Sequence, residues 1–124
     1  MGKGGAKKVL IIDDDHRNTF ALNAVLKAKG FFCTTADSAE EGLKILSSDS
    51  EFAVILLDMM MPEMDGYEAI HAIRHQQIKT IPIISVTAQA MQGDEEKCLE
   101  AGANAYIPKP VDADKLLSLL NRYL

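Results

Sequence analysis

The chain has 124 residues, of which 48% are hydrophobic and 25% are charged, and its formal net charge is −5 at pH 7. This length matches one globular domain with a substantial core and is too short for two ordinary domains. The acidic balance argues against direct binding of nucleic acid, which depends on Lys and Arg contacts to phosphates. Because no apolar run approaches the roughly 18 residues that a membrane-spanning helix needs, a transmembrane segment is also excluded.

The N-terminal segment, residues 1–7, is rich in glycine and lysine and lacks the apolar stretch of a secretory signal. We expect it to be a disordered leader or an extension added for expression, followed by a single domain over residues 8–124. Cys33 and Cys98 are the two cysteines, and they lie in unrelated segments without metal-ligand spacing. We therefore expect reduced thiols rather than a disulfide, which favours a cytoplasmic protein.

Five short apolar runs alternate with five segments of helical pattern, which predicts β-α repeats and a parallel sheet. Four of the runs are nearly free of polar residues, as expected of strands that helices cover on both faces. The second run mixes apolar and polar residues and is predicted to be an edge strand. The predicted strands are residues 9–12, 31–35, 52–57, 81–86 and 105–107.

The predicted helices carry their own start and stop signals. Gly30 is expected to close the first helix, and Gly102 is expected to cap the fourth in the left-handed conformation. Capping residues precede the second, third and fifth helices, two of them with the three-residue spacing of a capping box. These are Ser38 with Glu41, Asp65 with Glu68, and Asp112.

Polar residues follow four of the five predicted strands at the point where each strand ends. In an open parallel sheet these positions share one edge, at the carboxyl ends of the strands, where such folds form their ligand sites. We therefore expect residues nearly a hundred positions apart to lie close together. They are Asp13, Asp14 and Asp15 after the first strand, Asp58 after the third, Thr87 and Ala88 after the fourth, and Lys109 after the fifth.

Carboxylates that converge raise the pKa of at least one of them unless a cation lies among them. Mg²⁺ prefers oxygen ligands and is typically held by one or two carboxylates together with phosphate oxygens. Asp13, Asp14 and Asp58 would supply the acids, while Lys109 and Thr87 would supply a cation and a hydroxyl for phosphate oxygens. The set predicts a magnesium-assisted phosphoryl-transfer site.

Each of these residues also has a simpler interpretation. Asp15 fits the N-cap of the first helix, and a lone acid such as Asp58 is often a turn residue. Thr87 could be a turn hydroxyl, and Lys109, between two prolines, could lie on the surface. Their joint position at the strand ends favours the site.

The methionines and histidines near these motifs are not predicted to bind a metal through their side chains. The run Met59–Met61 is expected to form a loop and to pack, since thioethers are too soft for Mg²⁺, although one backbone carbonyl could be a ligand. His16, His71 and His75 show no metal-ligand pattern and are expected to be solvated or locally packed.

Four motifs, in this order, resemble those of the receiver domains of two-component response regulators. They are VLIIDDD, VILLDMMMPEMDG, IPIISVTAQA and GANAYIPKP, and the resemblance covers residues 8–124. It implies an α/β, flavodoxin-like (βα)5 fold, a doubly wound five-stranded parallel sheet in the strand order 2-1-3-4-5.

The same resemblance implies a role for each site residue. Asp58 matches the phosphoacceptor, Asp14 the direct Mg²⁺ ligand, and Asp13 an acid that acts largely through water. The implied metal ligands are Asp13, Asp14, Asp58 and the backbone carbonyl of Met60, with Mn²⁺ as a possible substitute for Mg²⁺. The phosphoryl group would be stabilised by Lys109, Thr87 and the Ala88 amide, Thr87 and Tyr106 would form a switch pair, and the Lys109–Pro110 peptide bond would be cis.

The resemblance further implies partners. A histidine kinase or histidine phosphotransfer protein would donate the phosphoryl group against the first helix, around residues 17–26. A downstream protein would read the fourth helix, fifth strand and fifth helix. Residues 87–110 look more like receivers of hybrid histidine kinases or phosphorelays, with a stand-alone response regulator as the alternative. The isolated domain would be no enzyme beyond its own phosphorylation and dephosphorylation.

Three other kinds of site match the sequence less well. A haloacid-dehalogenase-type phosphatase requires a second Asp two positions after the nucleophile, where this chain has Met60. An FMN-binding module requires a Ser/Thr/Gly-rich loop after the first strand, where the acids 13–15 would repel a phosphate without a metal. A dinucleotide site lacks its G-x-G-x-x-G motif. A degenerate receiver would lack Asp58 or Lys109, and both are present.

Overall fold

The computed structural model describes residues 8–48, 52–59, 66–75, 81–87, 94–109 and 111–123. These residues form a five-stranded parallel sheet in the order β2-β1-β3-β4-β5, as predicted. The strands are β1 Lys8–Ile12, β2 Phe32–Ala36, β3 Val54–Asp58, β4 Ile83–Thr87 and β5 Ala105–Pro108. The helices are α1 His16–Ala28, α2 Ala39–Ser48, α3 Gly66–His75, α4 Asp94–Ala101 and α5 Ala113–Tyr123.

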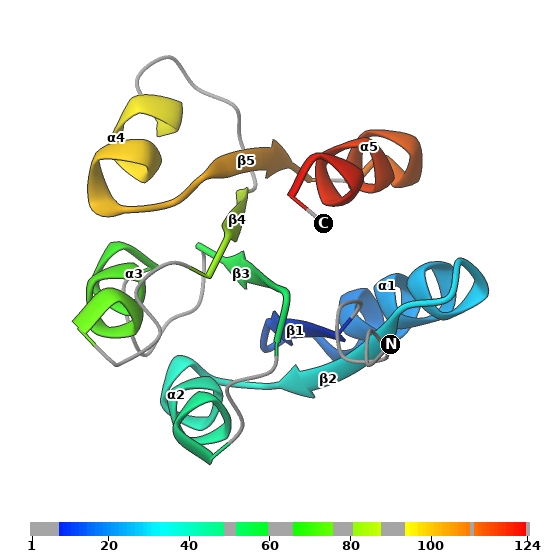
Figure 1. Ribbon diagram of the computed structural model, residues 1–124, viewed down its shortest axis with the longest axis horizontal. Coiled ribbons are helices and arrows are strands. Elements are labelled where there is room, and N and C mark those ends of the chain that lie inside the picture. Colours follow the sequence, from blue (N-terminus) through cyan, green and yellow to red (C-terminus); the bar gives the residue numbers. More distant parts are fainter. Residues whose placement is uncertain are drawn as a thin grey trace.

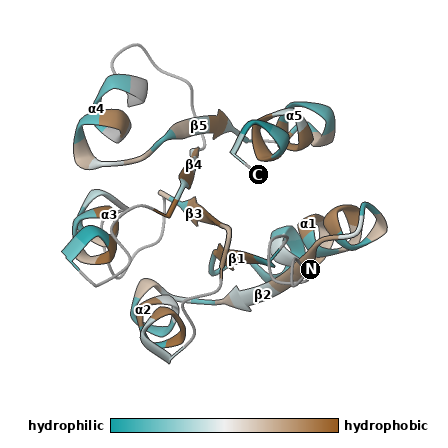
Figure 2. Cartoon of the chain, in the orientation of Figure 1, coloured by the Kyte–Doolittle hydropathy of each residue, from teal (hydrophilic) through white to brown (hydrophobic). Residues whose placement is uncertain are grey.

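Helices cover both faces of the sheet, with α2, α3 and α4 on one side and α1 and α5 on the other (Figure 1). Strand β3 is brown over most of its length in Figure 2, whereas α3 and α5 carry both hydrophobic and hydrophilic residues. Every residue of β3 and β4 is buried, as predicted for central strands. Strand β2 lies at an edge and is partly exposed, which confirms its predicted position.

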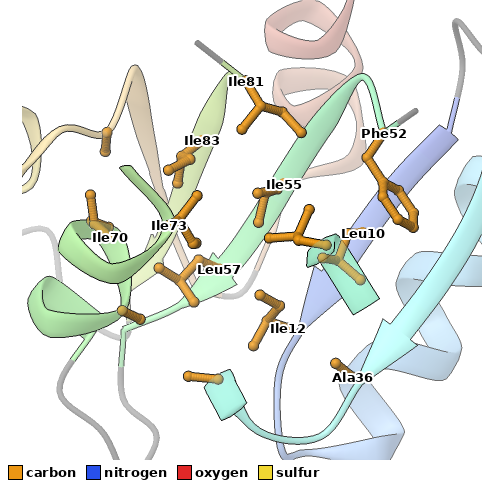
Figure 3. Close-up of a cluster of buried hydrophobic side chains, with 14 residues drawn as sticks. Leu10, Ile12, Ala36, Phe52, Ile55, Leu57, Ile70, Ile73, Ile81 and Ile83 are labelled. Carbon is orange, nitrogen blue, oxygen red and sulfur yellow. The ribbon is translucent and has the colours of Figure 1, made fainter. Parts of the chain in front are cut away.

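Alternate residues of each strand point to opposite faces, which produces two separate cores. The core under α2 and α3 includes Leu10, Ile55 and Ile83 from the strands and Ile70 and Ile73 from α3 (Figure 3). The core under α1 and α5 is built from Val9, Ile11, Leu22, Leu26, Val54, Leu56, Ile84, Leu116 and Leu120, among others. The two cores hold the sheet rigid from both sides.

The predicted helix signals within the described residues are confirmed. Gly30 and Gly102 have φ angles of +91° and +124°, which side chains other than glycine rarely adopt. The Ser38 hydroxyl accepts the N–H of Glu41 at 3.1 Å, and the Asp112 carboxylate accepts the N–H of Asp114 at 2.9 Å. The capping box at Asp65 begins outside the described residues.

Each predicted strand is present, but four of them end one residue later than predicted. The ladder pairs Asp58 with Val86 and Thr87 with Pro108, so the acid and the hydroxyl are the last residues of β3 and β4. The sequence pattern placed them after the strands because they are polar. Main-chain pairing with the neighbouring strand continues past the last apolar side chain, and the candidate functional groups are therefore fixed by the sheet itself.

Cys33 lies half-buried on β2 as a free thiol. Burial raises its pKa from 9.0 to about 11, because desolvation disfavours the thiolate. The unfolded chain therefore loses this proton at a lower pH than the folded protein does. The contribution to stability is complete below about pH 9 and is lost as the pH rises towards 11.

We expect the free energy of unfolding to fall more in the wild-type protein than in Cys33→Ala as the pH rises from about 8.5 to 11. This range contains the pKa values of the Cys33 thiol in the unfolded and folded protein, 9.0 and about 11. Urea unfolding at several alkaline pH values measures this difference, because other titrating groups are common to both proteins. Parallel pH profiles for the two proteins would contradict the raised pKa.

Among the described residues, no helix is long and apolar enough to cross a membrane.

Candidate functional site

Four elements bring the predicted site residues to one edge of the sheet. Asp13 follows β1 directly, Asp58 ends β3, Thr87 ends β4 and Lys109 follows β5. The central pairing of β1 with β3 runs to Ile12 and Leu57, so Asp13 and Asp58 lie side by side at the strand ends. Strands β1 and β3 are neighbours, and the helices that follow them, α1 and α3, cover opposite faces of the sheet (Figure 1). This is the topological switch point where such sheets bind ligands.

Three carboxylates form a cluster at this edge. Oxygen atoms of Asp13, Asp14 and Asp58 all lie within 4.8 Å of one another. The side chains of Asp13 and Asp58 are buried, with 2% and 3% of their surface exposed, whereas Asp14 is exposed. Two of the three acids are therefore shielded from solvent, and the third is accessible to it.

A lysine compensates the buried acids. The Lys109 Nζ lies 3.3 Å from Asp58 Oδ1 and 3.9 Å from Asp13 Oδ2. Its backbone N–H donates to the carbonyl of Thr87 at 2.6 Å, which fixes the residue to the end of β4. A buried carboxylate is costly without such a partner, so Lys109 offsets part of the cost of placing the two acids side by side.

The residue that caps α1 supplies a further donor to Asp13. The backbone N–H of Asp15 donates to Asp13 Oδ1 at 2.9 Å, while the Asp15 side chain accepts the N–H of Arg17 and caps α1. This confirms the helix-capping interpretation of Asp15. The acidic run 13–15 is thus divided between a buried acid, an exposed acid and a helix cap.

Thr87 and Tyr106 lie on neighbouring strands close to this edge. Thr87 is buried, with 6% of its surface exposed, and Tyr106 is half-buried and pairs in register with Ser85. Met60, Ala88 and Pro110, for which the sequence predicts a backbone ligand, a backbone donor and a cis bond, lie outside the described residues. Their roles stay predictions.

The histidines take no part in the cluster. His16, His71 and His75 are all exposed, as expected for solvated side chains. His16 Nε2 lies 3.9 Å from Asp37 Oδ2, and both side chains are largely exposed to solvent. This pair is a surface contact of small energetic weight.

Two features of the site were not predicted from the sequence. Asn18, in the first turn of α1, donates a hydrogen bond from Nδ2 to Asp13 Oδ2. A groove of about 520 Å³ also lies between α1 and α5, lined by Ala21, Leu22, Val25 and Leu116 with Asp15, Asn18 and Lys109. A polar residue in a first helical turn is common, so nothing in the pattern singled out Asn18, and the groove depends on how two helices pack.

The donor set at this edge consists of carboxylate oxygens with one ammonium group beside them. Hard oxygen donors suit a small divalent cation, and no thiolate or imidazole belongs to the cluster in the part of the chain that the structure describes. The three carboxylates carry more negative charge than the single Lys109 ammonium can neutralise, and a bound divalent cation would offset the remainder. The residues present therefore fit such an ion.

Comparison with known proteins identifies the family. Residues 9–121 match the family model of the response regulator receiver domain. The chain belongs to this family. As a receiver domain it is 44% identical over 95 residues to Histidine kinase 1 of Arabidopsis thaliana, which covers 74% of the chain and 8% of the kinase. It is also 31% identical over 123 residues to the two-component response regulator ORR5 of rice, Oryza sativa subsp. japonica, which covers 98% of the chain and 92% of that protein.

Solved receiver structures have the same fold. The receiver domain of the sensor histidine kinase PA1611 from Pseudomonas aeruginosa superimposes with a TM-score of 0.86 at 33% identity, covering 95% of the chain and 97% of that domain. That structure is described with a magnesium ion coordinated in its active-site cleft. The flavodoxin-like fold expected from the sequence is confirmed, and the receiver domain resembles both hybrid kinase receivers and response regulators.

Proposed function

We propose that this receiver domain accepts a phosphoryl group onto Asp58 from a phosphohistidine on a partner protein. The observation that carries the proposal is the position of Asp58, buried at the end of central strand β3 with its Oδ1 3.3 Å from the Lys109 ammonium. Asp13 is less suited to attack, because the Lys109 ammonium lies farther from its carboxylate, 3.9 Å from Oδ2. Asp14 is exposed and so lacks a preorganised, water-excluded environment.

The reaction exchanges one bond to phosphorus for another. A carboxylate oxygen of Asp58 attacks the phosphorus in line, the P–N bond to the donor imidazole breaks, and the imidazole nitrogen keeps the electron pair and takes up a proton. Lys109 neutralises charge on the phosphoryl oxygens, and the Thr87 hydroxyl and Ala88 amide donate to them. The isolated domain turns over no other substrate, so its chemistry is its own phosphorylation and dephosphorylation.

Asp13, Asp14 and Asp58 would hold Mg²⁺, with the Met60 carbonyl as a fourth protein ligand. Support comes from the fit of the carboxylate cluster and from the magnesium ion described in the P. aeruginosa receiver. The bound ion would neutralise negative charge on the transferred phosphoryl group. Mn²⁺, which also takes oxygen ligands, would substitute for it.

The groove between α1 and α5 supports a docking site for the phosphodonor along residues 17–26. Its apolar residues Leu22, Val25 and Leu116 lead to Lys109 at the site, so a helix of a histidine kinase or phosphotransfer protein seated there would bring its phosphohistidine to Asp58. Phosphorylation would then shift Thr87 and Tyr106 and bias the α4-β5-α5 surface that a downstream protein reads.

The parent protein is proposed to be a cytoplasmic hybrid histidine kinase or phosphorelay component. The 44% identity to Histidine kinase 1 supports this origin. The 92% coverage of ORR5 supports the alternative, a stand-alone response regulator. The free thiol of Cys33 is consistent with a reducing compartment.

Incubation with Mg²⁺ and acetyl phosphate, followed by intact mass measurement, tests the function. We expect a labile adduct of roughly 80 Da, the mass of one phosphoryl group, that does not form when EDTA removes divalent cations before acetyl phosphate is added. Asp58→Asn keeps the size of the side chain without its nucleophilic oxygen and should show no adduct. An unchanged adduct in Asp58→Asn, or labelling that is insensitive to EDTA, would overturn the proposal.

A further inference from the structure

Asn18 is the residue at which the carboxylate cluster meets the groove between α1 and α5. It is half-buried in the first turn of α1, and its Nδ2 donates to Asp13 Oδ2. Its side chain also lines the groove beside Lys109. No role for it follows from the motifs that identify the family, so its contacts alone indicate what it does.

The orientation of Asp13 depends on a small set of donors, because the side chain is only 2% exposed. The Asp15 N–H holds Oδ1 at 2.9 Å, and Asn18 holds Oδ2. Lys109 Nζ lies 3.9 Å from that same Oδ2 but 3.3 Å from Asp58 Oδ1. Asn18 and Lys109 therefore face the same oxygen of Asp13, and of the two only Asn18 lies within hydrogen-bond distance of it.

We propose that Asn18 is a positioning residue for phosphoryl transfer. It holds the carboxylate plane of Asp13 towards the cation site and leaves the Lys109 ammonium paired with Asp58. The inference rests on the function proposed above and names a residue that acts through Asp13 rather than on the reacting atoms. Partners of metal-binding side chains commonly alter metal affinity by about 10- to 100-fold when they are removed.

Asn18→Leu removes the donor, keeps a side chain of similar size and keeps water away from Asp13. Without the amide, the carboxylate is free to turn towards Lys109, and the closer ion pair competes with a divalent cation. We expect the dissociation constant for Mg²⁺ to rise about tenfold. Phosphorylation by acetyl phosphate should slow at limiting Mg²⁺ and approach the wild-type rate at saturating Mg²⁺.

Isothermal titration of Mg²⁺ into the phosphate-free protein measures the affinity directly. Asn18→Gln keeps an amide donor and should recover part of the affinity. Ser47→Leu is the control for adding a leucine to a helix surface, since Ser47 is exposed on α2 and its hydroxyl donates within its own helix to the Lys44 carbonyl. Asn18→Ala, at a position where alanine favours the helix, serves as the second variant if the leucine variant does not fold.

A dissociation constant within about twofold of wild type in Asn18→Leu or Asn18→Ala would overturn the inference, since removal of a working outer-shell partner costs about tenfold. A rate defect that persists at saturating Mg²⁺ would also overturn it, because Asn18 would then act on the reaction itself. If the wild type binds Mg²⁺ but gains no phosphoryl group, the proposed function fails, and the affinity comparison still tests Asn18. The two failures are therefore distinguishable.

Discussion

Lys109→Met is expected to slow phosphorylation of Asp58 by acetyl phosphate at least 100-fold at saturating Mg²⁺, since loss of one preorganised charge-stabilising donor costs about 100- to 1,000-fold. The Lys109 ammonium lies 3.3 Å from Asp58 Oδ1, where charge on the phosphoryl oxygens would develop in the proposed transfer. Methionine keeps the length of the side chain and removes its charge. Intact mass measured against time gives the rate.

The same variant is expected to bind Mg²⁺ more tightly than the wild type. Three carboxylates lie within 4.8 Å of one another, and removal of the ammonium leaves their charge without its fixed partner. The variant should therefore bind a divalent cation more tightly and accept the phosphoryl group more slowly. This opposite change separates Lys109 from Asn18, whose removal is expected to weaken Mg²⁺ binding.

Lys44→Met, an exposed position on α2, is the control for replacing a surface lysine. It should change neither the Mg²⁺ affinity nor the phosphorylation rate. If Lys109→Met accepted the phosphoryl group at the rate of this control, Lys109 would have no part in stabilising the transferred group. If it bound Mg²⁺ more weakly, the charge balance described for the carboxylate cluster would be wrong.

Arg74→Met is expected to lower the free energy of unfolding by about 3 kcal/mol, since it leaves the partly buried carbonyls of Gly102 and Ile81 without their charged donor. Arg74 lies on α3, and its guanidinium donates to the carbonyls of Gly102 at 2.7 and 3.0 Å and of Ile81 at 2.6 Å. It also donates to Asn104 Oδ1 at 2.9 Å. Partial burial lowers the pKa of this guanidinium, because desolvation disfavours its charge.

Urea unfolding of Arg74→Met beside Arg122→Met measures the difference. Arg122 is exposed on α5, and its replacement should change the free energy of unfolding by less than about 0.5 kcal/mol. Arg74→Lys keeps the charge but lacks the planar fork that reaches several acceptors, so it should recover little of the loss. Equal stability of Arg74→Met and Arg122→Met would show that the contacts to Gly102, Ile81 and Asn104 contribute nothing.

Local sequence patterns predicted the elements of this fold well. Alternating apolar runs and helical segments gave the five parallel strands, and the mixed run at residues 31–35 correctly marked an edge strand. Caps at Ser38 and Asp112 and the left-handed Gly30 are determined by residues close by in the chain, which is why they could be predicted. The strand order came from the family resemblance, since periodicity alone does not fix it.

The site could be predicted in part because strand ends meet at one edge of a parallel sheet. That rule placed Asp13, Asp58 and Lys109 together, and the structure brings them within ion-pair distance. The rule gave no distances, and it did not predict that Asp58 is the last residue of the β3 ladder. Asn18 was missed because polar residues are common in a first helical turn. Arg74 was missed because its partners are set by tertiary packing, and it contacts a carbonyl 28 residues away.

Chemical reduction identifies the side chain that carries the phosphoryl group. Borohydride reduces an acyl phosphate to an alcohol, so treatment of the protein after exposure to Mg²⁺ and acetyl phosphate should convert phosphorylated aspartate to homoserine. Peptide mass mapping then locates the change. We predict homoserine at position 58 alone. Homoserine at Asp13 or Asp14, or an unmodified Asp58 in protein that carries the phosphoryl mass, would contradict the assignment of Asp58 as the phosphoacceptor.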